Sequence, residues 1–250
     1  MIRTMDYVER KAYAKINLGL DVLRRREDGY HEVKMIMQTV DIWDRLTFRI
    51  SSEPEIELSV GDVPLPAGKD NLIYRAAELL MKEKNIRQGV KITLEKNIPV
   101  AAGMAGGSTD AAAVFHGLNE LFDLSMSLED MKKLGVKIGA DVPYYIMGGT
   151  ALSEGIGEIL TPLPAPPACI LVVAKPDIDV STKFVYENLH ADKLKGHPDI
   201  DGMTEAIKNG DLDGITKRMA NVLETVTIRA YPVIEQIKEQ RRQKGRKTHL

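Results

Sequence analysis

NIPVAAGMAGGSTDAAAVF, which runs from Asn97 to Phe115, joins an expected strand to an expected helix. The preceding segment, Val90–Lys96, alternates apolar and polar residues, as a strand with one buried face does. Pro99 ends that strand because proline has no backbone N–H to donate. The polar triplet Ser108–Asp110 is expected to cap the helix that the following alanines continue.

Three glycines of this connection, Gly103, Gly106 and Gly107, are separated only by small residues. Backbone amides without nearby Cβ atoms can approach a ligand closely. Together with the positive end of a helix dipole they predict an anion site, and polyphosphate is the anion expected. A tight turn without a ligand has the same composition, so that alternative stays open. No lysine precedes Ser108 as a Walker loop requires, and Pro99 separates the glycines from the strand, unlike a Rossmann fingerprint.

The composition is that of an ordinary globular protein. The 250 residues suffice for one large domain or two small ones, with 44% hydrophobic and 28% charged residues. A formal net charge of −2 gives no reason to expect nucleic acid as a partner. The N-terminus is too charged for a secretory signal, no apolar run is long enough for a membrane, and we expect a cytoplasmic protein. The single cysteine, Cys169, lies in an apolar run and is expected to be a packed core thiol.

Residues 11–23 alternate strictly and predict a strand. Ala12, Ala14, Ile16 and Leu18 share one face, which leaves Lys15 and Asn17 side by side on the other. A solvated strand lysine is the common alternative for Lys15. The small and apolar neighbours in AKINLGL instead favour a functional role for these two polar groups.

The charged turn RRREDG precedes Tyr30 and His31, which open the next expected strand. His31 could be a surface histidine. Beside it, however, Tyr30 offers a ring for stacking, and a neutral histidine offers a donor and an acceptor to a planar base edge. Further strands are expected at Arg45–Ile50 and Glu55–Val60, so the first third of the chain is predicted to be rich in β-structure.

Two helices and one isolated carboxylate are expected in the middle of the chain. Asp70-Asn71 caps an amphipathic helix over Leu72–Lys84, and Ser127 starts a helix over Leu128–Ile138. Asp141 stands among apolar residues before Pro143. It is either a helix cap or a functional carboxylate.

The proline-rich segment Leu160–Ala168 predicts a domain boundary. A buried strand, Cys169–Ala174, and a helix, Thr182–His190, are expected after it. Shorter helices follow, at 204–208, 213–220 and 231–242. The basic tail RRQKGRKTHL is expected to be a solvated terminus.

Three segments together resemble the GHMP small-molecule kinases: AKINLGLDVLRRREDGYHEV, IPVAAGMAGGSTDAAA and IGADVPYYIMGGTAL. VSTKFVYENL and NVLE resemble the same family. The similarity covers almost the whole chain in order. The Asp-Gly-Tyr-His segment points to those members that phosphorylate the 2-hydroxyl of a cytidyl diphosphate sugar alcohol in isoprenoid precursor synthesis.

The resemblance implies an α+β, two-lobed fold, with an S5-like N-terminal lobe (1–162) that binds ATP and a ferredoxin-like C-terminal lobe (163–250) that binds the substrate. It implies ATP and Mg²⁺ as cofactors, a small-molecule substrate, and a monomer or weak homodimer. Lys15 and Asp141 would be the catalytic pair. The nucleotide would contact Asn71, Pro99, Gly103, Met104, Ala105, Gly106, Gly107, Ser108 and Thr109, with Ser108 near the metal. The substrate would contact Asn17, Tyr30, His31, Thr182 and Tyr186.

The chain departs from the family pattern in two places. Ala105 replaces a glycine of the loop, which is a minor change if its φ is negative. After KGRKTHL, at Leu250, the chain lacks the family's third glycine-rich motif and the strand and helix that complete the second lobe. We therefore expect an incomplete C-terminal lobe with an exposed sheet edge. The alternatives are another GHMP kinase, such as one for homoserine or mevalonate, or an inactive nucleotide-binding remnant.

Overall fold

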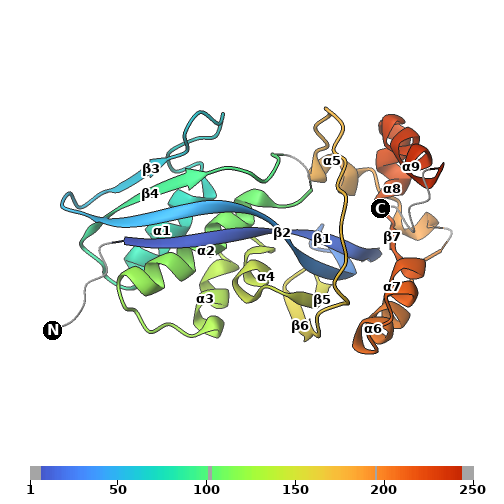
Figure 1. Ribbon diagram of the computed structural model, residues 1–250, viewed down its shortest axis with the longest axis horizontal. Coiled ribbons are helices and arrows are strands. Elements are labelled where there is room, and N and C mark those ends of the chain that lie inside the picture. Colours follow the sequence, from blue (N-terminus) through green and yellow to red (C-terminus); the bar gives the residue numbers. More distant parts are fainter. Residues whose placement is uncertain (1–6, 101–102, 195, 244–250) are drawn as a thin grey trace. The chain divides into compact units, whose positions relative to one another are not determined.

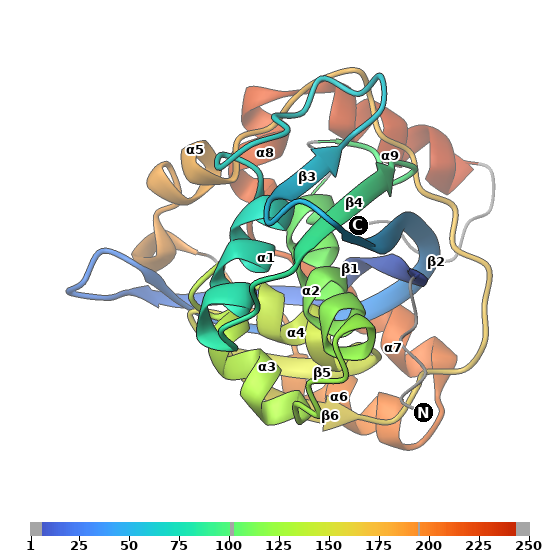
Figure 2. The ribbon, with the colours of Figure 1, turned by 90° about the vertical axis from the view of Figure 1, so that its left-hand side faces the viewer.

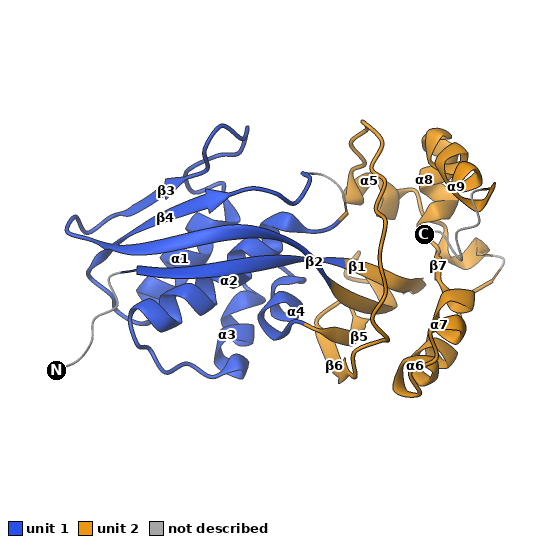
Figure 3. Ribbon diagram, in the orientation of Figure 1, with its two compact units in different colours: residues 1–15, 40–100, 104–148 blue, residues 16–39, 101–103, 149–250 orange. Residues whose placement is uncertain are grey.

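The computed structural model describes residues 7–100, 103–194 and 196–243 (Figure 1). The chain divides into two compact units (Figure 3). Unit 1 comprises residues 1–15, 40–100 and 104–148, and unit 2 comprises residues 16–39, 101–103 and 149–250. Two long strands, β1 (Tyr7–Arg25) and β2 (His31–Ser51), each contribute residues to both units. The tail beyond Gln243 lies outside the described residues, and so does the place where the third glycine motif was expected.

In unit 1, strand β4 (Gly89–Glu95) lies between β3 (Ile56–Ser59) and β2. It pairs antiparallel with β2, with Arg45 opposite Glu95, and parallel with β3. The alternation that predicted β4 is confirmed, because its apolar side chains Val90, Ile92 and Leu94 are buried. The two strands expected in the 30–50 region form one continuous strand, β2.

Four helices pack beside the strands of unit 1 (Figure 2). They are α1 (Leu72–Glu83), α2 (Gly106–Leu121), α3 (Leu128–Gly135) and α4 (Val142–Met147). Phe48 of β2 is fully buried, and Gly117 of α2 lies directly against its ring. A side chain at position 117 would collide with that ring, so the glycine lets α2 approach the sheet closely.

Two helix caps predicted from the sequence in unit 1 are confirmed. Asn71 caps α1 by accepting a hydrogen bond from Ile73 N, and Ser127 caps α3 by accepting one from Asp130 N. Helix α3 ends at Gly135, earlier than the expected Ile138, because Lys137 N and Ile138 N donate to the carbonyls three residues before them, Leu134 O and Gly135 O, rather than four.

In unit 2, β5 (Thr150–Gly155) pairs antiparallel with β2 and with β6 (Ile159–Leu163). The short strand β7 (Ala220–Asn221) pairs parallel with β1, with Gly19 opposite Ala220. The helical elements are α5 (Thr182–Glu187), η1 (Ala191–Lys193), α6 (Ile200–Lys208), α7 (Leu212–Arg218), α8 (Glu224–Ala230) and α9 (Val233–Gln243). Their core includes Leu18, Ile36 and Met203.

The periodicity of β1 predicts burial only in its first half. Burial alternates from Val8 to Ala14, but Lys15 and all residues from Leu18 to Val22 are buried. Asp21 is 3% exposed although it was expected on the open face. Elements brought in from distant parts of the chain cover the second face, such as α6, whose Ile200 and Met203 lie against Gly19.

The expected buried strand Cys169–Ala174 is wrong. These residues form no helix or strand, Cys169 is exposed, and Ile170 is 94% exposed. An apolar run is buried only where a partner covers it, and in the described residues nothing pairs with this one. The boundary expected at 160–168 falls inside unit 2, just where β6 ends. The assignment of 1–162 and 163–250 to separate lobes stays a prediction.

No helix in the described ranges is both long and apolar enough to cross a membrane.

Candidate active site

The glycine-rich connection enters helix α2 through unusual backbone angles. Gly103 has φ +69° with open space around its missing Cβ, and Ala105 has φ +48°, in the left-handed region. The condition under which Ala105 would be a minor change, a negative φ, is therefore not met. The backbone of Ala105 turns the chain so that its carbonyl accepts hydrogen bonds from both Ser108 N and Thr109 N.

Helix α2 begins at Gly106, so the expected cap formed by Ser108–Asp110 is wrong. Ala105 occupies the cap position, and no side chain caps the helix. In an α-helix the first N–H groups have no partner within the helix, and here they belong to Gly106 and Gly107. No capping side chain accepts a hydrogen bond from these two N–H groups. They are therefore suited to bind an anion.

Two hydrogen bonds hold the start of α2 within unit 1. Thr109 Oγ1 donates to the carbonyl of Tyr13 on β1 (2.8 Å), two residues before Lys15. Tyr145 of α4 donates its hydroxyl to the carbonyl of Met104 (3.2 Å). Burial raises the pKa of Tyr145 well above its usual range, with Asp141 adding to the effect, so the phenol stays a donor. Tyr145 is not among the site residues predicted from the sequence.

Lys15 and Asp141 both belong to unit 1 and act on each other electrostatically. The Lys15 side chain is buried, and this burial lowers its pKa, while the Asp141 carboxylate opposes the change. Lys15 is therefore not a solvated strand lysine. Asp141 stands at the cap position of α4, but its side chain makes no capping hydrogen bond. The helix-cap alternative for Asp141 is not what the structure shows.

Three buried ionic groups lie beneath the same connection. Lys96 forms an ion pair with Asp44 and lies 3.4 Å from Asp110 Oδ2. Burial raises the pKa of Asp110 to about 8, although Lys96 lowers it in part. Lys96 and Asp110 flank the glycines in sequence, which is a signal that could have been noticed. Asp44 lies 52 residues from Lys96 and could not.

Asn71 and Pro99, expected on the nucleotide side, also lie in unit 1. The Asn71 side chain caps α1, and its amide donates to Pro66 O (2.7 Å). Only its second amide hydrogen is left for another partner. Pro99 is exposed and follows Ile98, whose N–H is bound by Asp44.

Five residues expected on the substrate side lie in unit 2: Asn17, Tyr30, His31, Thr182 and Tyr186. The rings of His31 and Tyr186 are 5.2 Å apart between centroids and tilted by 37°, within the range of an aromatic contact. Burial lowers the pKa of His31, assisted by Arg25, and therefore favours the neutral ring that can both donate and accept.

Tyr30 is 60% exposed, so its ring is available to a ligand. Thr182 is the first residue of α5, after the cap Ser181, and Asn17 is partly buried on β1. The resemblance implies that Tyr30, His31 and Tyr186 all contact the substrate, and this stays a prediction. The structure adds a contact between the rings of His31 and Tyr186, which sequence spacing could not reveal.

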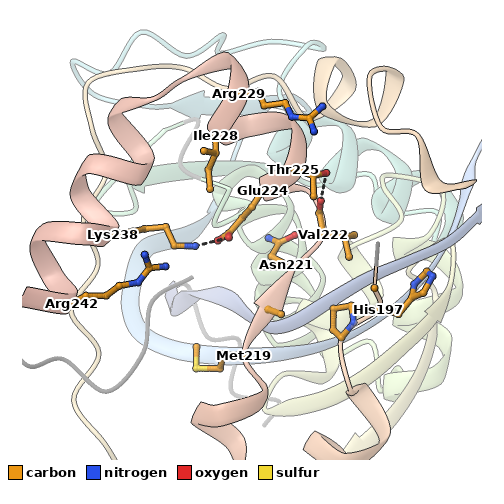
Figure 4. A pocket seen from close by; sticks show the side chains of 13 residues that line it. His197, Met219, Asn221, Val222, Glu224, Thr225, Ile228, Arg229, Lys238 and Arg242 are labelled. Atoms are coloured by element: carbon orange, nitrogen blue, oxygen red, sulfur yellow. Dashed lines mark hydrogen bonds and ion pairs between the residues drawn. The ribbon is translucent and has the colours of Figure 1, made fainter. Parts of the chain in front are cut away.

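A cavity of about 660 Å³ in unit 2 lies between α8, α9 and the segment around His197 (Figure 4). None of the expected site residues lines it. Its charged side chains are mostly paired: Lys238 with Glu224 (2.5 Å), Arg242 with Glu235 (3.1 Å) and His197 with Asp21 (2.8 Å). This cavity is therefore distinct from the candidate site.

A metal ion would find few protein ligands here. Within the ranges that the structure describes, no group of three or more His, Cys, Asp or Glu side chains could hold one. Mg²⁺ commonly takes one or two protein ligands together with substrate phosphates and water. Ser108, in the first turn of α2, fits that kind of site.

The comparisons with known proteins agree on one family. The model of the GHMP kinases N terminal domain matches residues 71–149. The chain is 55% identical to a 4-diphosphocytidyl-2-C-methyl-D-erythritol kinase of Lachnoclostridium phytofermentans, over 94% of this chain and 80% of that protein. It is 50% identical to one of Geobacillus, over 94% and 81%.

Solved structures give the same picture. A crystal structure of 4-(cytidine 5'-diphospho)-2C-methyl-D-erythritol kinase is 35% identical, with TM-score 0.78 over 95% of this chain and 84% of that one. Homoserine kinase from Cytophaga hutchinsonii is 19% identical, with TM-score 0.73 over 96% and 80%, which shows the shared fold alone.

Proposed function

The chain belongs to the 4-diphosphocytidyl-2-C-methyl-D-erythritol kinases of the GHMP kinase superfamily, and we propose how its residues carry out the transfer. It is a phosphotransferase with a small-molecule substrate. The resemblance read from the three sequence segments is confirmed. The accepting group in our proposal is the 2-hydroxyl of the methylerythritol, and ATP is the donor.

The start of α2 would bind the ATP phosphates. The unpaired amides of Gly106 and Gly107 and the positive end of the helix dipole suit a polyphosphate. The left-handed angles at Gly103 and Ala105 aim the backbone of the loop, with Met104 held by Tyr145. Pro99 and the remaining amide hydrogen of Asn71 would lie toward the adenine end. ATP supplies the phosphoryl group, and Mg²⁺, near the Ser108 hydroxyl, would offset part of its charge.

Lys15 and Asp141 would act on the accepting hydroxyl. Asp141 can accept or orient the hydroxyl proton, since its side chain is not used to cap α4. Lys15 can stabilise the negative charge that develops on the oxygen, and its lowered pKa makes it a better proton donor than an exposed lysine. Phosphoryl transfer asks for this positioning and charge compensation more than for covalent chemistry.

The residues of unit 2 would recognise the cytidyl group. The contact between His31 and Tyr186 supports a base-binding role, with the Tyr186 ring stacking and the neutral His31 reading the polar base edge. The exposed ring of Tyr30 would stack on the base as well. Thr182 would support the diphosphate, and Asn17 would position the alcohol.

The single observation that carries this proposal is the electrostatic coupling of the buried Lys15 to the partly buried Asp141, in the same unit as the N-terminal end of α2. Its test is an assay of ATP-dependent phosphorylation of the cytidyl alcohol. Asp141→Asn and Lys15→Met should each lower kcat about 10²-fold or more, because each removes a group that acts in the transition state.

Thermal unfolding of both variants checks that they remain folded. Asp62→Asn, an exposed carboxylate in the same unit, is the matched control and should leave kcat unchanged. A folded Asp141→Asn or Lys15→Met variant with near-normal kcat would remove that residue from the chemistry. Absence of transfer by the wild-type chain would contradict the proposed activity itself.

We also propose that the protein is a monomer or weak homodimer and works in the cytoplasm. Sedimentation at several concentrations tests the first point, and fractionation of the source cells tests the second.

A further inference from the structure

The ionic cluster of Asp44, Lys96 and Asp110 takes no part in the chemistry proposed above. All three side chains are almost fully buried, with 0%, 6% and 2% exposed. A buried ion pair is weak evidence for stability, because the cost of removing charges from water can exceed their attraction. We therefore look for a role of this cluster other than stability.

Asp44 fixes the end of strand β4. One of its carboxylate oxygens accepts hydrogen bonds from Asn97 N (2.5 Å) and Ile98 N (2.7 Å). The other oxygen binds the Lys96 ammonium. The last residue before the glycine-rich connection and the first two residues within it are thus held by a single carboxylate of β2.

Lys96 carries this anchor across to helix α2. Its ammonium lies 3.4 Å from Asp110 Oδ2, one turn into the helix. A Cβ built on Gly106 would come within 2.5 Å of Lys96 Nζ, so the ammonium lies against the backbone of the first residue of α2. Residues 97–105 connect β4 to α2. Lys96 directly precedes this connection, and its side chain contacts the helix that follows it.

We propose that Lys96 is a positioning residue for the nucleotide, which sets the place of the α2 amides that would bind the phosphates. The inference rests on the proposed function, since it assumes that ATP binds at these amides. Lys96 acts through the backbone of Gly106 and is not itself a catalytic residue.

The proposal predicts a specific kinetic signature. Lys96→Met should raise the KM for ATP by about tenfold, the size expected from the loss of about one hydrogen bond between the displaced amides and a phosphate. The KM for the cytidyl alcohol should stay within about twofold of wild type, and kcat within about threefold. A purely structural ion pair would instead change the two KM values equally or leave both unchanged.

Lys96→Met leaves the Asp44 carboxylate and the Asp110 carboxyl group buried without a cation, which destabilises the fold. The double variant Lys96→Met/Asp110→Asn removes one of them, and Asp44 keeps its two amide donors. Asp110→Asn alone provides the reference for the double variant. Lys91→Met is the matched control, at an exposed lysine of β4 that pairs with Glu57 at the surface.

The affinity for ATP is also measured by calorimetry without the second substrate, which separates this inference from the phosphorylation activity. An about tenfold weaker ATP affinity in the double variant, relative to Asp110→Asn, supports the role of Lys96. Affinity and KM for ATP within twofold of that reference overturn it. If wild type binds ATP but transfers no phosphate, the proposed function fails while the role of Lys96 in ATP binding is still decided.

Discussion

At the scale of single residues, burial changes the chemistry of side chains whose type was known from the sequence. Lys15 and Asp141 were expected as a pair, and the structure adds that Lys15 is buried and that Asp141 raises its pKa against that burial. Cys169 was expected in the core and is exposed. Exposure to solvent sets both the pKa of Lys15 and the accessibility of the Cys169 thiol, and residue type alone does not determine that exposure.

His116 gives a prediction at the same scale. Burial lowers its pKa, and its Nε2 lies 3.0 Å from the carbonyl of Ile146. Below the ordinary pKa of about 6.5 the unfolded chain binds a proton at His116 that the folded chain binds less readily, so the contribution of His116 to the free energy of unfolding should fall as the pH drops from 7 to 5. His116→Gln, which does not titrate, should lose less stability over that range.

Chemical denaturation at pH 7, 6 and 5 measures this. His190→Gln, at an exposed histidine, is the control and should follow the wild-type dependence. An equal loss of stability in wild type and His116→Gln would mean that the folded state does not disfavour the charged ring.

At the scale of elements, the start of α2 depends on a strained residue. Ala105 adopts a left-handed conformation that costs a residue with a Cβ about 1–2 kcal/mol, whereas glycine adopts it readily. The polar residues expected to cap the helix lie inside its first turns and serve other partners, such as Tyr13 for Thr109. The helix start is set by the backbone rather than by a capping side chain.

Ala105→Gly should therefore stabilise the protein. The relief of strain exceeds the entropy cost of a glycine, and we expect about 0.5–1 kcal/mol more free energy of unfolding. Ala113→Gly in the middle of the same helix is the matched control and should destabilise by about 1 kcal/mol. Urea denaturation of the three proteins gives both values. A loss of stability in Ala105→Gly would contradict the strain at that position.

At the scale of the whole molecule, each of the two units is assembled from separate segments of the chain. The first unit takes residues from three segments, and so does the second. Membership of the GHMP kinases could be read from ordered motifs because these motifs keep their sequence and spacing. The division into units could not, since it depends on which segments contact one another after β1 and β2 have crossed from one unit to the other.

The exposed segment 169–173 gives the prediction for this scale. Cys169 is the single cysteine of the chain, so labelling reports on that segment alone. A thiol reagent should react with the native protein within about tenfold of the rate for the denatured chain, as access limits a thiol of ordinary reactivity. Cys169→Ser supplies the blank. Protection by about a hundredfold or more would mean that the segment is covered in solution.

The sequence by itself determined the strands and helices whose periodicity and caps are local, among them β4, α1 with Asn71 and the start of α3 at Ser127. It also identified the family and predicted an anion site at the glycine-rich connection, because glycines and ordered motifs act over short stretches. The tertiary structure alone decided the burial of Lys15, the contact of His31 with Tyr186, and the ionic cluster that joins Asp44 to Lys96. Such contacts form between residues far apart in the chain, and the local alternation of side chains carries no information about what will cover them.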